Sequence, residues 1–174
     1  MIKYIGEKDY QHGSEDRTGI LLTNLGTPDE PNSRALKPYL REFLSDPRVI
    51  EIPKIFWQII LNGVILQIRP RKSAKTYQSI WTEEGSPLLT ISKKQLDKVQ
   101  QKLKSEFPNT IFILAMRYGN PSIPKALKEF QQNNVRRILI LPLYPQYCAA
   151  TTASTFDAIT SILQKWRWIP ELRF

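Results

Sequence analysis

Residues 18–28 read TGILLTNLGTP, and this stretch decides the fold. Ile20, Leu21 and Leu22 form a short apolar run, which soon reaches Gly26 and Pro28. An apolar run of this length that ends at turn residues is typical of a strand buried on both faces. The sequence therefore predicts a first strand here, followed by a loop over residues 24–28.

Two similar apolar runs follow, TIFILAM at 110–116 and RILILPLY at 137–144, and ELRF at 171–174 begins another. Strands that alternate with helices indicate an α/β fold with a doubly wound, Rossmann-like parallel sheet, joined by right-handed crossovers. Ligands of such sheets bind outside the carboxyl ends of the strands. Helical spacing between the runs predicts helices at 34–44, 72–81, 90 or 92 to 107, 123–132 and 154–166.

The start of the first helix and one apolar segment each allow two interpretations. Ser33 is a candidate cap for the first helix, but Pro38 favours a later start, because proline fits best in a first turn. Residues 53–68 (PKIFWQIILNGVILQI) are unusually apolar. They fit either a core helix broken near residues 62–63 or an exposed apolar lip.

The amino-acid composition excludes several classes of function. A chain of 174 residues fits one domain. One Cys and one His exclude a disulfide framework, a CxxC zinc site and a histidine metal cluster. No apolar stretch reaches the ~18 residues of a membrane span, and the first 20 residues lack a signal peptide's apolar run. The expected location is therefore the cytoplasm.

The net charge of +9 favours an acidic partner, such as nucleic acid, anionic lipid or a small polycarboxylate. One basic cluster stands beside rings and a hydroxyl within eighteen positions. Such a mixture suits a flat apolar ligand with carboxylate edges, but equally a single-stranded nucleic acid. Composition does not separate the two. The residues of this mixture are Arg69, Arg71, Lys72, Tyr77, Trp81 and Ser86, and Tyr144 follows the third strand.

Four stretches in this order and spacing resemble the ferrochelatases: TGILLTNLGTP, YLREFLSDPRVIEIP, AKTYQSIWTEEGSPL and LILPLYPQYCAATTAS. The similarity is greatest to the bacterial branch that forms protohaem, and it runs from about Thr18 to the end of the chain. It implies a fold of two similar α/β halves with the porphyrin between them, of which this chain supplies the first. The implied division is a flexible arm at 1–17, an amino-terminal domain at 18–168 and the start of the second half at 169–174.

The resemblance also implies the porphyrin-binding residues. Leu25 matches a position against the porphyrin face, and its leucine, where some relatives carry tyrosine, favours protoporphyrin as substrate. Arg69 matches a propionate-binding arginine, with Arg71 and Lys72 as its neighbours. The remaining matches are polar or aromatic: Tyr77 and Ser86 at the same edge of the macrocycle, and Tyr144 in the pocket after the third strand.

Iron insertion needs a general base, and histidine is the usual choice. The family's histidine and its glutamate partner match positions beyond Phe174, so the resemblance implies no catalytic residue in this chain. His12 is expected to be solvated and without function. Cys148 stands one place before the position of a cluster ligand in some relatives, so it is expected to be a small pocket or core residue, with no iron–sulfur cluster. Two alternatives remain: a non-catalytic porphyrin- or haem-binding domain, and a basic RNA-binding domain.

Overall fold

The computed structural model describes residues 4–7 and 12–174. These residues form one parallel sheet of four strands, in the order β2-β1-β3-β4. The fold is therefore α/β, as predicted. The strands are β1 (Arg17–Thr27), β2 (Thr110–Gly119), β3 (Val135–Pro142) and β4 (Glu171–Arg173).

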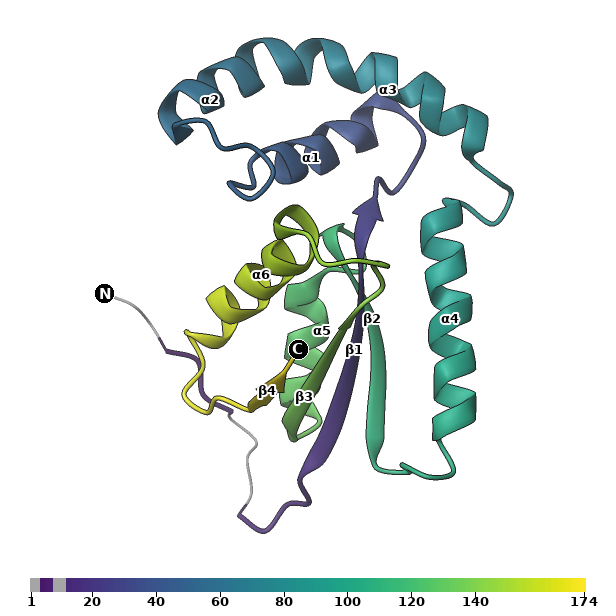
Figure 1. Ribbon diagram of the computed structural model, residues 1–174, viewed down its shortest axis with the longest axis vertical. Coiled ribbons are helices and arrows are strands. Elements are labelled where there is room, and N and C mark those ends of the chain that lie inside the picture. Colours follow the sequence, from purple (N-terminus) through teal and green to yellow (C-terminus); the bar gives the residue numbers. More distant parts are fainter. Residues whose placement is uncertain (1–3, 8–11) are drawn as a thin grey trace.

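Helices cover both faces of the sheet, which confirms the doubly wound arrangement (Figure 1). The helix α4 (Pro87–Leu103) precedes β2 and packs on one face, against β1 and β2. The chain then reverses direction across the sheet, so α5 (Ile123–Gln132) and α6 (Ser154–Leu163) lie on the opposite face. Right-handed crossovers require this change of face when the strand order reverses.

The two faces are not equally covered. The core under α5 and α6 contains twelve buried hydrophobic residues, whereas the core under α4 contains Leu22, Leu114 and Met116. Adjacent residues of β3 show this unequal coverage of the two faces. Ile140 is 1% exposed, whereas Leu141, which points to the α4 side, is 41% exposed. Because α4 packs on β1 and β2, β3 remains partly open on that face.

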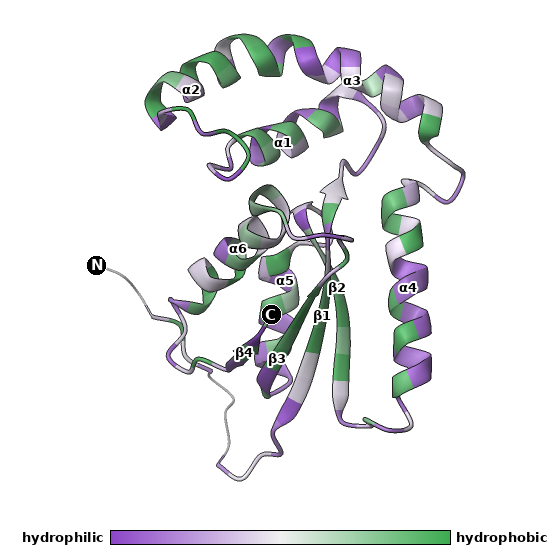
Figure 2. Cartoon of the chain, viewed as in Figure 1, coloured by the Kyte–Doolittle hydropathy of each residue, from purple (hydrophilic) through white to green (hydrophobic). Residues whose placement is uncertain are grey.

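Between β1 and α4, residues 33–80 form an arch over the carboxyl ends of the strands (Figure 1). The arch contains α1 (Ser33–Leu44), α2 (Lys54–Ile60), the π-helix η1 (Leu61–Ile65) and α3 (Leu66–Ile80). Hydrophobic residues crowd α2 (Figure 2), and Ile55, Phe56 and Ile59 are 67–77% exposed. Of the two interpretations of residues 53–68, the exposed apolar segment is therefore the observed one. The helix continues through residues 62–63 as the π-turn rather than breaking there.

Three predicted helix starts are wrong. Asn32, not Ser33, caps α1, because its side chain accepts a hydrogen bond of 2.9 Å from the Ala35 amide. Pro38 lies within α1 rather than delaying its start. The helix α4 begins at Pro87, since proline is favoured in a first turn, and α3 begins at Leu66, continuous with η1.

The predicted arm at 1–17 lies partly outside the described residues, at 1–3 and 8–11. Its described residues contact the body of the protein. The Ile5 amide donates to the Lys165 carbonyl at 2.7 Å, and the Glu7 carboxylate accepts two hydrogen bonds of 2.6 Å from Arg136 on β3. The boundaries at 17/18 and 168/169 stay predictions. Within the described residues, no helix has the length and apolar character needed to span a membrane.

Candidate functional site

The first site element is the end of β1. Leu25 lies within the strand, since β1 extends to Thr27, and not in a loop as predicted. It is half-buried against the apolar cluster of the arch, beside the buried residues Tyr39 and Tyr118. Gly26 follows with a φ of 110°, and a Cβ atom there would stand 1.8 Å from the Tyr118 carbonyl oxygen. A glycine is therefore required for β1 and β2 to meet this closely beneath the arch.

A chain of rings leads from this point along the arch. Tyr39 donates a hydrogen bond of 3.3 Å to the Gly26 carbonyl, and its ring meets Tyr77 edge-on at 6.4 Å. Tyr77 in turn meets Trp81 at 6.4 Å. Burial, followed by the neighbouring Tyr77, raises the pKa of Tyr39 well above its ordinary value. Tyr77 packs on the same cluster as Leu25, so the structure brings these two predicted residues together.

Tyr144 lies two residues after β3, in a connection that we call the Tyr144 corner (residues 143–148). Its hydroxyl is buried and forms no hydrogen bond of standard geometry with the described residues. Burial raises the pKa of Tyr144 to about 12, while nearby Thr155 and Arg117 act to lower it. Tyr144 is also the last of the nearby groups that contribute to the raised pKa of Tyr39. The hydroxyl is a protonated donor at neutral pH.

Arg69, Arg71 and Lys72 lie on α3, and all three are exposed. Within residues 4–7 and 12–174, none of them forms an ion pair or a side-chain hydrogen bond. The arch thus carries cations that remain open to an anionic ligand. The structure does not join them to the ring cluster by any hydrogen bond.

Ser86 is 6% exposed and lies at the start of α4. It lines a cavity of about 670 Å³ together with Trp81, Leu89 and Thr27. A second cavity, of about 280 Å³, lies beside it and is lined by Tyr39, Glu42 and Thr27. Of the seven predicted residues, Ser86 alone lines the larger of these two cavities, and none lines the smaller.

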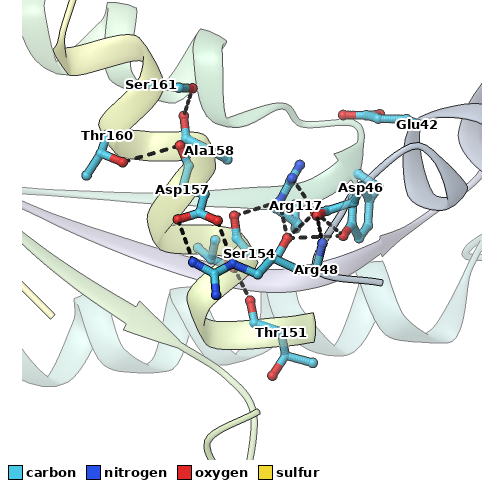
Figure 3. A network of polar contacts seen from close by, with 12 residues as sticks. Glu42, Asp46, Arg48, Arg117, Thr151, Ser154, Asp157, Ala158, Thr160 and Ser161 are labelled. Carbon is cyan, nitrogen blue, oxygen red and sulfur yellow. Dashed lines mark hydrogen bonds and ion pairs between the residues drawn. The ribbon is translucent and has the colours of Figure 1, made fainter. Parts of the chain in front are cut away.

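Beneath the site lies a buried polar network that the sequence did not predict (Figure 3). The Asp46 carboxylate accepts hydrogen bonds from Arg117 at 2.6 Å and from the Tyr118 hydroxyl at 2.8 Å. It also accepts one from the Ser154 hydroxyl. The signal in the sequence is a charged residue inside an apolar strand, Arg117 in TIFILAMRYG, because a buried cation needs an acidic partner.

Burial raises the pKa of the Asp46 carboxyl. The hydrogen bonds from Ser154, Tyr118 and the Arg48 amide, together with the Arg117 charge, outweigh this effect. The net result is a pKa below the ordinary value of aspartate. Asp46 is therefore ionised at neutral pH although its side chain is only 3% exposed.

Two other predicted residues are exposed. His12 is exposed, and Cys148 is exposed as well, so the expectation of a core position for Cys148 is wrong, while a pocket position stays a prediction. The cysteine lies at the surface because the Tyr144 corner runs outside the sheet. Among the described residues, no group of three or more His, Cys, Asp or Glu could hold a metal ion.

Comparisons with known proteins agree with one another. The ferrochelatase family model matches residues 17–174. The ferrochelatase of Thioalkalivibrio sulfidiphilus is 53% identical over 174 residues, which cover 99% of this chain and 47% of that protein. The ferrochelatases of Hydrogenovibrio crunogenus and Idiomarina loihiensis are 56% and 52% identical, with 47% and 48% of their lengths covered.

The chain thus spans about half the length of the curated relatives it matches. The match nevertheless extends over the whole sheet and the whole arch, because both lie within residues 17–174. This protein belongs to the ferrochelatase family.

Proposed function

We propose that this chain is the porphyrin-binding, amino-terminal half of a ferrochelatase, the lyase that inserts ferrous iron into protoporphyrin IX to form protohaem. One observation carries the proposal: Leu25 and Tyr77 pack on one apolar cluster, which also contains the buried rings of Tyr39 and Tyr118. This cluster lies at the carboxyl ends of the strands, where α/β sheets bind their ligands. Family membership supplies the ligand class.

The site residues divide between the face and the edge of the macrocycle. Leu25, Tyr77 and Tyr144 offer apolar and aromatic surface to the flat face. Arg69 is the proposed partner of a propionate, with Arg71 and Lys72 beside it, because guanidinium groups bind carboxylates with two parallel hydrogen bonds. Ser86, buried at the start of α4, is proposed to bind the same edge of the macrocycle.

Metal insertion also requires removal of two pyrrole protons, for which histidine is the usual base, and no histidine is among the described residues that line the site. Its single histidine, His12, is exposed in the amino-terminal segment. We infer that the base belongs to the second half of a full-length relative. Iron enters as substrate, and the proposal includes neither a resident metal nor an iron–sulfur cluster. The proposed location is the cytoplasm, with any membrane contact peripheral.

Titration with protoporphyrin IX tests the proposal. Binding should shift the Soret band and quench porphyrin fluorescence, and Arg69→Ala should weaken binding about tenfold, because a charge-assisted hydrogen bond to a propionate is lost. Lys98→Ala is the matched control, since it removes an exposed cation from α4, outside the site. Equal binding by wild type and Arg69→Ala would contradict the assigned role. Failure of the wild type to bind would contradict the function.

A non-catalytic porphyrin-binding domain is the second candidate, and the absence of histidine after position 12 favours it for this chain taken alone. Anaerobic insertion of zinc or ferrous ions separates the two. We expect the isolated chain to bind porphyrin without exceeding the uncatalysed rate of insertion. A labelled single-stranded RNA serves as competitor, and displacement of porphyrin at low salt would revive the nucleic-acid alternative.

A further inference from the structure

We propose that Asp46 is a positioning residue, whose carboxylate fixes the Tyr144 corner against the arch and so sets the shape of the porphyrin site. This role rests on the proposed function above. It adds a residue that makes no contact with the ligand and acts through Ser154 and Arg117.

The carboxylate joins three separate parts of the chain. Asp46 follows α1 in the arch, Arg117 and Tyr118 lie at the end of β2, and Ser154 begins α6 (Figure 3). One oxygen of Asp46 accepts hydrogen bonds from the side chains of all three partners. The other accepts the Arg48 amide at 2.7 Å, which holds the turn after α1. Both oxygens are thus bound within the protein, which suits positioning better than ligand contact.

We call Asp46 with its partners Arg117, Tyr118 and Ser154 the Asp46 hub. Ser154 links this hub to the Tyr144 corner. It directly follows the π-helix η2 (Ala149–Ala153), which continues from the corner. Arg117 Nε donates to both the Ser154 carbonyl at 3.0 Å and the Ser154 hydroxyl at 2.6 Å. Ser154 is fully buried, so few alternative rotamers are open to it. The start of α6, and with it the end of the corner, is therefore held from two sides.

Charge balance makes the carboxylate essential to the arrangement. The Arg117 side chain is 15% exposed, and Asp46 is its ion-pair partner. Arg117 also lies close enough to Tyr144 to influence that hydroxyl. Without the negative charge, the largely desolvated guanidinium of Arg117 would move toward water or toward Tyr144. Either movement would release Ser154 and change the wall of the site.

On the arch side, the same hub sits beside an aromatic contact. Phe43 of α1 meets the Tyr118 ring edge-on at 5.1 Å, and the Arg117 guanidinium lies over the Tyr118 ring at 4.4 Å from its centre. Tyr118 is fully buried and belongs to the apolar cluster against which Leu25 and Tyr77 pack. Asp46 therefore holds both the Tyr144 corner and the apolar cluster of the arch through its single carboxylate.

The test compares Asp46→Asn with two controls in the full chain. Asp157→Asn breaks the nearby exposed pair with Arg48, and Ile159→Val lowers stability through the core under α5 and α6 without removing any hydrogen bond of the Asp46 network. We expect Asp46→Asn to weaken protoporphyrin binding about tenfold at a temperature where all variants are folded, the loss typical of a broken buried charge-assisted hydrogen bond. Neither control should change the affinity. An unchanged affinity in Asp46→Asn, or an equal loss in Ile159→Val, would overturn the proposal.

Hydrogen exchange provides a readout that needs no porphyrin. Amides of residues 143–153 should exchange faster in Asp46→Asn than in Ile159→Val at matched stability, because only the former releases Ser154. If the wild type fails to bind porphyrin, the proposed function fails, while the exchange pattern still decides whether Asp46 positions the corner. Ser154→Ala should reproduce the effect, and the double variant should lose less than the sum, since both act through one contact. Additive losses would count against the shared hub.

Discussion

At the scale of single residues, Asp46 is where burial and charge oppose each other most clearly. Burial acts to neutralise the carboxylate, yet its hydrogen-bond donors and Arg117 keep its pKa below the ordinary value. A carboxylate whose pKa is lower in the folded state than in the unfolded state stabilises the fold at any pH above the unfolded value. That stabilisation is lost as the pH falls through the folded value.

The free energy of unfolding should therefore depend on pH in the acid range because of Asp46. Asp46→Asn should lower the free energy of unfolding at pH 7 by on the order of 3 kcal/mol, because it leaves the buried Arg117 without its counter-charge. The difference between variant and wild type should begin to shrink below pH ~4, where aspartate in the unfolded chain takes up a proton, and should vanish only once the pH falls below the lower pKa of folded Asp46. The side chains of Ser154, Tyr118 and Arg117 and the Arg48 amide are the groups that face the carboxylate.

Urea unfolding at several pH values between 7 and 3 measures both quantities. Asp157→Asn is the matched control, because its ion pair with Arg48 is exposed and screened by solvent. It should leave the unfolding midpoint nearly unchanged at each pH. A gap between Asp46→Asn and wild type that stays constant down to pH 3 would show that the charge of Asp46 is not the stabilising feature.

At the scale of elements, β3 shows how one strand can be buried on one face and open on the other. Ile140 belongs to the core under α5 and α6, whereas Leu141 faces the side that α4 leaves partly open. Ile140→Ala should therefore cost about 3 kcal/mol, and Leu141→Ala less than about 1 kcal/mol. Thermal or urea unfolding of the two variants makes the comparison within a single strand. Equal costs would indicate that the α4 face of β3 is covered in solution.

The strands were predictable because their apolar runs are short and end at turn residues, and β1, β2 and β3 each contain the predicted run at least in part. Helix starts were less predictable. A proline is common both in turns and in the first turn of a helix, so the start predicted at residue 90 or 92 misses Pro87, where α4 begins. The continuous helix from α2 through η1 into α3 was not predicted because residues 62–63 suggest a break, and the π-turn spans them instead. Pro70 also suggests a break, yet it lies inside α3.

The candidate site was predictable only where rings and cations cluster in sequence. Tyr77 and Leu25 are far apart along the chain, and only the resemblance to a family joined them before the structure did. Asp46 could not be found from spacing, because its partners Arg117 and Ser154 stand 71 and 108 positions away. Hydrogen-bond networks between residues this far apart in the sequence form only in the tertiary fold, so local sequence patterns do not identify all of their members.

At the scale of the whole molecule, two opposing forces decide whether this chain stays monomeric. Apolar side chains gather on the outer side of the arch, where Ile55, Phe56 and Ile59 are at least 67% exposed, and contiguous patches of this kind promote association. The net charge of +9 opposes association through repulsion. Salt screens that repulsion over roughly 10 Å at 0.1 M and leaves the apolar attraction in place.

Association should therefore increase with ionic strength, and it should depend on the arch. In sedimentation experiments, the wild type should move from the 20.3 kDa monomer toward larger species as salt is raised. Combined Ile55→Ser, Phe56→Ser and Ile59→Ser should restore the monomer at the same salt. Ile91→Ser with Phe107→Ser removes two exposed apolar side chains outside the arch and should leave association unchanged. A clean monomer of the wild type at high concentration and high salt would show that the exposed apolar surface of α2 is too small to bind a second copy, and that charge is not what holds the chains apart.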